Sequence, residues 1–79
     1  MKRKDFERAD WREESGYLVK NLKPDSIVLV NSENKQGKVV IWSGRYGQLE
    51  LKFSLSKFKS VQELEIFCLK FIINQEEND

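Results

Sequence analysis

Apolar and polar side chains alternate most regularly over residues 48–55. The apolar positions are Leu49, Leu51, Phe53 and Leu55, and the polar positions between them are Glu50, Lys52 and Ser54. Successive side chains of a β-strand point to opposite faces of the sheet. The alternation therefore predicts a strand with one buried face and one open face.

Two shorter apolar runs rich in β-branched residues come before this strand. Residues 26–30 follow the turn-forming pair Pro24-Asp25, and residues 38–42 follow a polar loop over residues 31–37. Runs of this length bounded by turn residues are typical of strands. The three runs together predict an antiparallel meander.

A helix is predicted over residues 61–75. Ser60 is a suitable N-cap, and Glu63 three residues later completes a capping box. One apolar stripe, expected to cover the sheet, consists of Val61, Leu64, Phe67, Cys68, Phe71 and Ile72. A second stripe consists of Ile66, Leu69 and Ile73. Either an N-terminal helix covers the second stripe through Phe6, Trp11 or Leu18, or the stripe contacts a partner. The acidic residues after Gln75 are expected to fray, because negative charge opposes the dipole at a helix C-terminus.

The charged N-terminal segment also predicts a helix, with two alternative boundaries. The helix either begins near Lys4 and stops at Gly16, or begins at Trp11 with Asp10 as its cap. Residues 17–22 fit either a helix or a strand.

The expected fold class is α+β, with one domain over residues 1–79. It has an N-terminal helical segment (1–24), a three-stranded antiparallel meander (25–55) and a C-terminal helix (60–75) packed on one face. A strand over residues 17–22 would make the meander four-stranded.

The turn before the third strand decides which face carries Trp42. A three-residue loop with Gly47 in the left-handed position pairs Gly44 with Gln48 and places Trp42 opposite Glu50. Val40 and Trp42 then lie on the open face. A loop of two or four residues would move Trp42 into the core, because a one-residue change of register exchanges the faces. The position of Gly47 favours the exposed alternative.

Composition narrows the function classes. The chain has no histidine and one cysteine, Cys68, so nucleophile–histidine pairs, zinc fingers and intrachain disulfides are excluded. Cys68 lies on the main apolar stripe and is expected to be a buried, inert thiol. We expect a cytoplasmic protein, because the N-terminus is charged and no apolar segment is long enough to span a membrane. Without histidine, a second cysteine or a phosphate-binding glycine pattern, we expect no catalytic residues, cofactor or metal.

The first functional hypothesis is a protein-binding module, an inhibitor or adaptor of the phage or mobile-element type, or a homodimer. Trp, Tyr and Arg supply much of the energy at interfaces. The predicted contact residues are Trp42, Val40, Arg45, Tyr46, Lys52 and Glu50, with Ile66, Leu69 and Ile73 as a second contact.

The second hypothesis is a module that binds single-stranded nucleic acid. The net charge is +1, but residues 35–59 hold six basic side chains against Glu50. These are Lys35, Lys38, Arg45, Lys52, Lys57 and Lys59. Lysine and arginine bind phosphates, and the aromatic residues among them could stack on bases.

One short stretch bears on the second hypothesis. The segment from Val28-Leu29-Val30-Asn31 to Gln36-Gly37 resembles the first hairpin of Sm-like RNA-binding proteins. Those folds end in further strands, whereas this chain ends in a long helix, so we do not assign the family.

Overall fold

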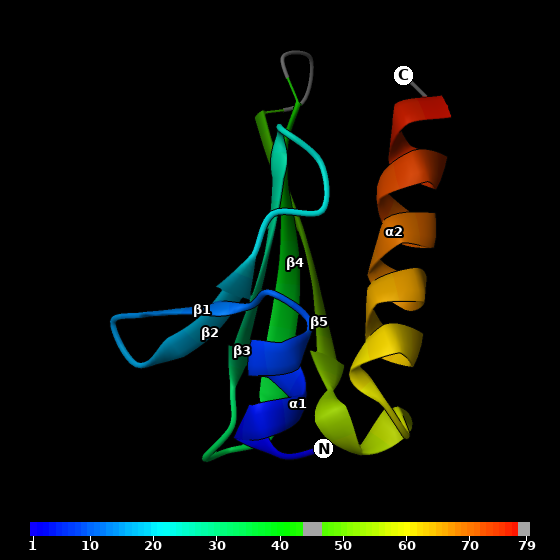
Figure 1. Cartoon of the computed structure of the whole chain (residues 1–79). Coiled ribbons are helices and arrows are strands. Elements are labelled where there is room, and N and C mark those ends of the chain that lie inside the picture. Colours follow the sequence, from blue (N-terminus) through cyan, green and yellow to red (C-terminus); the bar gives the residue numbers. More distant parts are fainter. Residues whose placement is uncertain (44–46, 78–79) are drawn as a thin grey trace.

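The computed structural model describes residues 1–43 and 47–77 (Figure 1). Its elements in chain order are α1 (Arg3–Arg8), β1 (Arg12–Glu14), β2 (Tyr17–Lys20), β3 (Ser26–Asn31), β4 (Gln36–Ser43), β5 (Gly47–Ser54), a short 3-10 turn (Leu55–Lys57) and α2 (Val61–Glu77). The α+β class is confirmed.

The five strands form one antiparallel sheet in the order β1-β2-β3-β4-β5. Each strand pairs with the next one along the chain, as in a meander. The prediction of three or four strands is therefore wrong in number, although the strand alternative for residues 17–22 is correct. The additional strand is β1, which belongs to the segment predicted to be helical.

The N-terminal segment bends out of its helix to bury two aromatic rings. Phe6 and Trp11 cannot share one face of a helix, because they are five residues apart. After α1 the chain turns at Asp10, whose φ is 66°. The rings of Phe6 and Trp11 pack edge to face, with their centroids 5.0 Å apart. The predicted start near Lys4 agrees with the start of α1 at Arg3, but α1 ends at Arg8 and not at Gly16, and the alternative start at Trp11 is wrong.

Ser15 and Gly16 form the turn between β1 and β2. Both residues have positive φ, 51° and 84°, and Glu14 pairs with Tyr17 across them. Two consecutive positive φ angles are the requirement of a two-residue type I′ hairpin turn. Gly16 therefore closes a hairpin and does not end a helix.

The pairing of β4 with β5 differs from the predicted register by two residues. Trp42 pairs with Gln48 and Val40 pairs with Glu50, whereas the expected partner of Trp42 was Glu50. A shift of two keeps every side chain on its expected face. Gly47 has a φ of 76°, in the left-handed region as predicted. The rest of the predicted turn, residues 44–46, lies outside the described residues.

The core lies between the sheet and α2, which stands along one face of the sheet (Figure 1). Ser60 accepts a hydrogen bond from the Glu63 backbone N–H at 3.1 Å, as expected of a cap. The main stripe of α2 faces the core: Val61, Leu64, Cys68 and Ile72 are buried, and Phe67 and Phe71 pack against them. The helix reaches Glu77, beyond the expected end, and Glu76 pairs with Lys23 at 3.6 Å.

The second stripe of α2 is not covered by the N-terminal segment. Phe6, Trp11 and Leu18 all belong to the main core cluster. Ile66 and Ile73 remain 48% and 36% exposed, and Leu69 is half-buried. The expectation that the N-terminal segment covers this stripe is therefore wrong.

Candidate functional site

The sheet has a face opposite α2, which we call the open face. The side chains on it alternate along the strands with core residues such as Leu18, Val28 and Val39. Its members from β2 to β5 are Tyr17, Val19, Ile27, Leu29, Lys38, Val40, Trp42, Gln48, Glu50 and Lys52.

The open face is apolar at its centre. Val19 pairs with Leu29 and Ile27 pairs with Val40, so four aliphatic side chains meet across β2, β3 and β4. The two valines are buried, whereas Ile27 and Leu29 are half-buried. The prediction that Val40 is exposed is wrong, because these longer neighbours shield it. It can support a contact surface but presents little surface itself.

Two aromatic residues stand at the margins of this apolar centre. Trp42 is 50% exposed, as the exposed alternative predicted, and Tyr17 is 40% exposed. Because Trp42 does not fill the core, its exposed ring contributes little to the folded state. Tyr17 was not predicted as a contact residue, because residues 17–22 fitted either a helix or a strand and their face was therefore not fixed.

An open groove of about 400 Å³ lies on the same face. It is lined by Tyr17, Leu29, Asn31, Asn34, Gln36, Gly37, Lys38 and Lys52. The groove lies at the Gln36 end of β4, whereas Trp42 lies near the other end of that strand. Four residues of strand span about 13 Å, so a single partner segment could contact both. Of the predicted contact residues, Lys52 lines the groove.

The described residues of the open face carry charges of both signs, Lys38 and Lys52 against Glu50. The Glu50 carboxylate accepts hydrogen bonds from Lys38 Nζ at 3.4 Å and from Gln48 Nε2 at 3.2 Å. Lys52 lies beside the groove. The face therefore combines an apolar centre with charges of both signs, which is the composition of a protein-binding surface more than of a phosphate-binding one.

The predicted basic residues that the structure describes do not form one stripe. Lys38 and Lys52 lie on the open face. Lys35 lies in the β3–β4 turn, and its carbonyl accepts a hydrogen bond from the Leu55 N–H at 2.9 Å. Lys57 ends the 3-10 turn, and Lys59 follows it. Arg45 and Tyr46 lie outside the described residues.

The second predicted contact faces away from the first. The main stripe of α2 packs on the sheet, so Ile66 and Ile73 project from the side of the helix that is turned away from it. The open face lies on the other side of the sheet. The two predicted surfaces are therefore separate, and one small partner cannot contact both.

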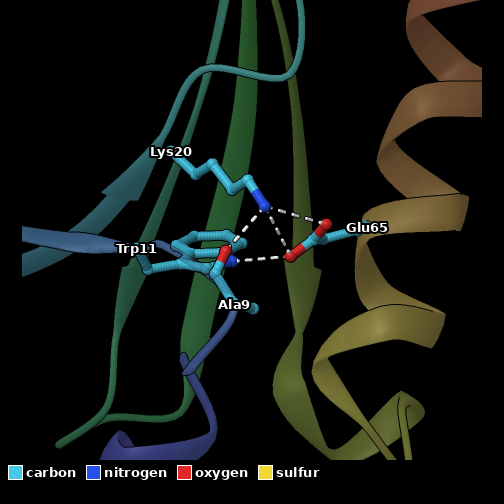
Figure 2. A network of polar contacts seen from close by, with 4 residues as sticks. All are labelled: Ala9, Trp11, Lys20 and Glu65. Carbon is cyan, nitrogen blue, oxygen red and sulfur yellow. Dashed lines mark hydrogen bonds and ion pairs between the residues drawn. The ribbon is translucent and has the colours of Figure 1, made fainter. Parts of the chain in front are cut away.

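A polar network at the edge of the core was missed by the sequence analysis (Figure 2). Glu65 accepts a hydrogen bond from Trp11 Nε1 at 2.8 Å and pairs with Lys20 Nζ at 3.2 Å. Lys20 Nζ also donates to the carbonyl of Ala9 at 2.7 Å. The only signal in the sequence was Trp11, because a tryptophan that becomes buried needs an acceptor for its indole N–H. The network joins three segments and is structural.

Cys68 is buried beside this network. Burial, with a smaller contribution from the negative charge of Glu65, raises the pKa of its thiol to about 12. A neutral buried thiol is a poor nucleophile. Cys68 therefore does not act as a nucleophile near neutral pH in the folded chain.

Comparison with known proteins gives no relative: no family model, no curated protein and no solved structure matches this chain. Within residues 1–43 and 47–77, no helix is long and apolar enough to cross a membrane.

Proposed function

We propose that this chain is a protein-binding module that uses the open face of its sheet. The observation that carries the proposal is the half-exposed Trp42 on a face that also holds the groove beside Tyr17. Exposed aromatic residues around an apolar centre are the residues that dominate binding energy at interfaces. The core is complete without them, so their exposure serves contact more than folding.

The shape of the face suggests the kind of partner. The groove and Trp42 lie along one direction of the sheet and are separated by about four strand residues. An extended segment of another protein, with an apolar side chain for the groove and another for Trp42, fits this arrangement. The Oδ1 atoms of Asn31 and Asn34 accept hydrogen bonds from backbone N–H groups of the β3–β4 turn, which leaves their Nδ2 groups, with the Gln36 amide, to hydrogen-bond the backbone of the segment. An inhibitor or adaptor acting on a larger protein is the role we assign.

The binding of single-stranded nucleic acid is the weaker alternative. On the open face, Lys38 is paired with Glu50. Of the other predicted basic residues that the structure describes, Lys52 lies on this face, and Lys35, Lys57 and Lys59 lie in or beside turns. Among residues 1–43 and 47–77, an anionic strand would therefore meet one uncommitted lysine on this face, Lys52, next to a carboxylate.

Affinity capture from the native host, with matched variants, tests the proposal. Trp42→Ala and Tyr17→Ala should each lose the captured protein, whereas Ile66→Ser, on the far side of α2, should retain it. Retention by both open-face variants would contradict the proposal. Binding of a labelled oligonucleotide that weakens steeply with salt would favour the alternative instead.

A further inference from the structure

The strand β5 is the last strand of the sheet that the structure describes, so one of its edges is unpaired there. It is eight residues long and last in the strand order. The Leu55 N–H donates to the Lys35 carbonyl, so Lys35 and Leu55 form a hydrogen-bonded pair. This pair determines which residues of β5 are bonded to β4. Because antiparallel strands alternate between bonded and non-bonded pairs, Phe53, Leu51 and Leu49 direct their backbone groups at β4.

The residues between them direct theirs outward. These are Gln48, Glu50, Lys52 and Ser54. Within the described part of the chain, no other strand pairs with this side of β5. A long edge without proline or a bulge is a template for strand pairing, and such edges are normally covered or blocked.

Part of the apolar surface around the core is also exposed along this edge. The hydrophobic residues that pack on the core and remain half-buried include Leu49 and Leu51 of β5 and Phe67 and Phe71 of α2. Phe67 lies over β5, with its ring 6.0 Å from that of Phe53. Phe71 is one helical turn further on the same side. The free edge thus carries a border of apolar surface.

We propose that β5 pairs antiparallel with β5 of a second copy of this chain, with Leu51 of each copy at the two-fold axis. The charges on the strand select this register. With Leu51 opposite Leu51, Glu50 of each copy lies opposite Lys52 of the other. A shift of the axis to Glu50 places two carboxylates opposite each other, and a shift to Lys52 does the same with two ammonium groups.

The same register also pairs the outward-directed backbone groups of the two strands and brings their apolar borders together. The outward-directed groups of Glu50 face those of Lys52 in the other copy, and those of Gln48 face Ser54. On the core side, Leu49 faces Phe53 of the second copy. The two-fold axis is perpendicular to the sheet, so both α2 helices lie on one side and the apolar border of each copy faces that of the other.

This pairing goes beyond the proposed function, because it uses the backbone edge of β5, with Glu50 and Lys52 at the margin of the open face, and leaves Trp42 uninvolved. Trp42→Ala should therefore abolish partner capture without changing self-association. Failure of one proposal leaves the other standing.

Disulfide trapping tests the register. Opposite residues of a non-bonded antiparallel pair have Cα atoms about 4.5 Å apart, which a disulfide can bridge. Leu51→Cys should therefore give a covalent dimer under mild oxidation. Leu49→Cys should not, because its copies lie roughly 13 Å apart, beyond the limit of about 7 Å. The unsubstituted chain, with buried Cys68 alone, is the control.

Charge exchange tests the interface without disturbing the core. Lys52→Glu and Glu50→Lys should each raise the dissociation constant of the dimer by about ten-fold, because attraction at two symmetric contacts becomes repulsion. The double variant should restore dimerisation, and Lys57→Glu should leave it unchanged. Analytical ultracentrifugation over a range of concentrations measures each constant. A monomer at every concentration, or cross-linking of Leu49→Cys equal to that of Leu51→Cys, would overturn the proposal.

Discussion

The Glu65 carboxylate of α2 lies 3.2 Å from the Lys20 amino group of β2, and both side chains are about three-quarters shielded from solvent. The same carboxylate accepts a hydrogen bond from the Trp11 indole N–H, and the same amino group donates one to the carbonyl of Ala9 (Figure 2). This pair therefore fastens the helix, the sheet and the N-terminal segment to one another. Part of its cost of desolvation is offset by these additional hydrogen bonds.

A double-mutant cycle should show that the pair is coupled. Lys20→Met and Glu65→Gln should each destabilise the fold, and their coupling free energy should be about 1 kcal/mol, as for shielded charged hydrogen bonds. Urea unfolding of the four proteins measures it. The exposed pair Arg3–Glu7 is the matched control, with coupling of no more than about 0.5 kcal/mol. Equal coupling in both pairs would show that shielding adds nothing.

The two tryptophans should respond oppositely to truncation. Trp11 is buried against Phe6, so Trp11→Ala should cost about 3–5 kcal/mol of unfolding free energy. Trp42 is half exposed, so Trp42→Ala should cost about 1 kcal/mol or less. Denaturant unfolding of both variants in parallel provides the comparison. A cost of several kcal/mol at Trp42 would place its ring in the core.

Gly37 should not tolerate a side chain. A Cβ there would lie 2.5 Å from the Phe53 ring and 3.2 Å from the Leu29 carbonyl oxygen. Gly37→Ala should therefore destabilise the fold by about 1–3 kcal/mol through overpacking. In a Phe53→Leu background the added cost should fall, because the smaller side chain vacates the space. Thermal unfolding measures both differences, and an unchanged cost in the second background would exclude the ring as the cause.

The parts of the fold that could be predicted from sequence are those with strong periodicity. The alternation around Leu51 and the cap at Ser60 each have one structural solution, so β5 and the start of α2 agree with their patterns. The N-terminal hairpin could not be found in this way. Both strands are short and β1 is polar throughout, and the need to bury both Phe6 and Trp11 outweighs the helix propensity of the charged residues around them.

The candidate site was predicted only in part. The face of Trp42 was predicted from the number of residues in the β4–β5 loop, because an odd or an even number places the side chain on opposite faces of the sheet. Loop length is a local property. The burial of Val40, the exposure of Tyr17 and the groove depend on which strands lie side by side. Pairing between β2 and β3 was not fixed by the sequence, so these features could not be derived from it.

Cys68 should make the stability of the fold sensitive to alkaline pH. Its thiol pKa is raised from 9.0 to about 12 by burial and, to a smaller degree, by Glu65. Above pH 9 the unfolded chain releases this proton while the folded chain retains it, so the unfolded state binds fewer protons. The contribution of the neutral thiol is complete below pH 9 and is lost as the pH rises toward 12.

The comparison of the chain with Cys68→Ala isolates this effect from lysine and tyrosine titration, which both proteins share. Between pH 8 and pH 10 the original chain should lose about 1 kcal/mol more unfolding free energy than Cys68→Ala. Urea unfolding at several pH values measures the difference. Thiol labelling at pH 8 provides an independent reading, because a buried neutral thiol reacts only when the chain opens. Parallel stability profiles together with rapid labelling would mean that Cys68 is accessible and not part of the core.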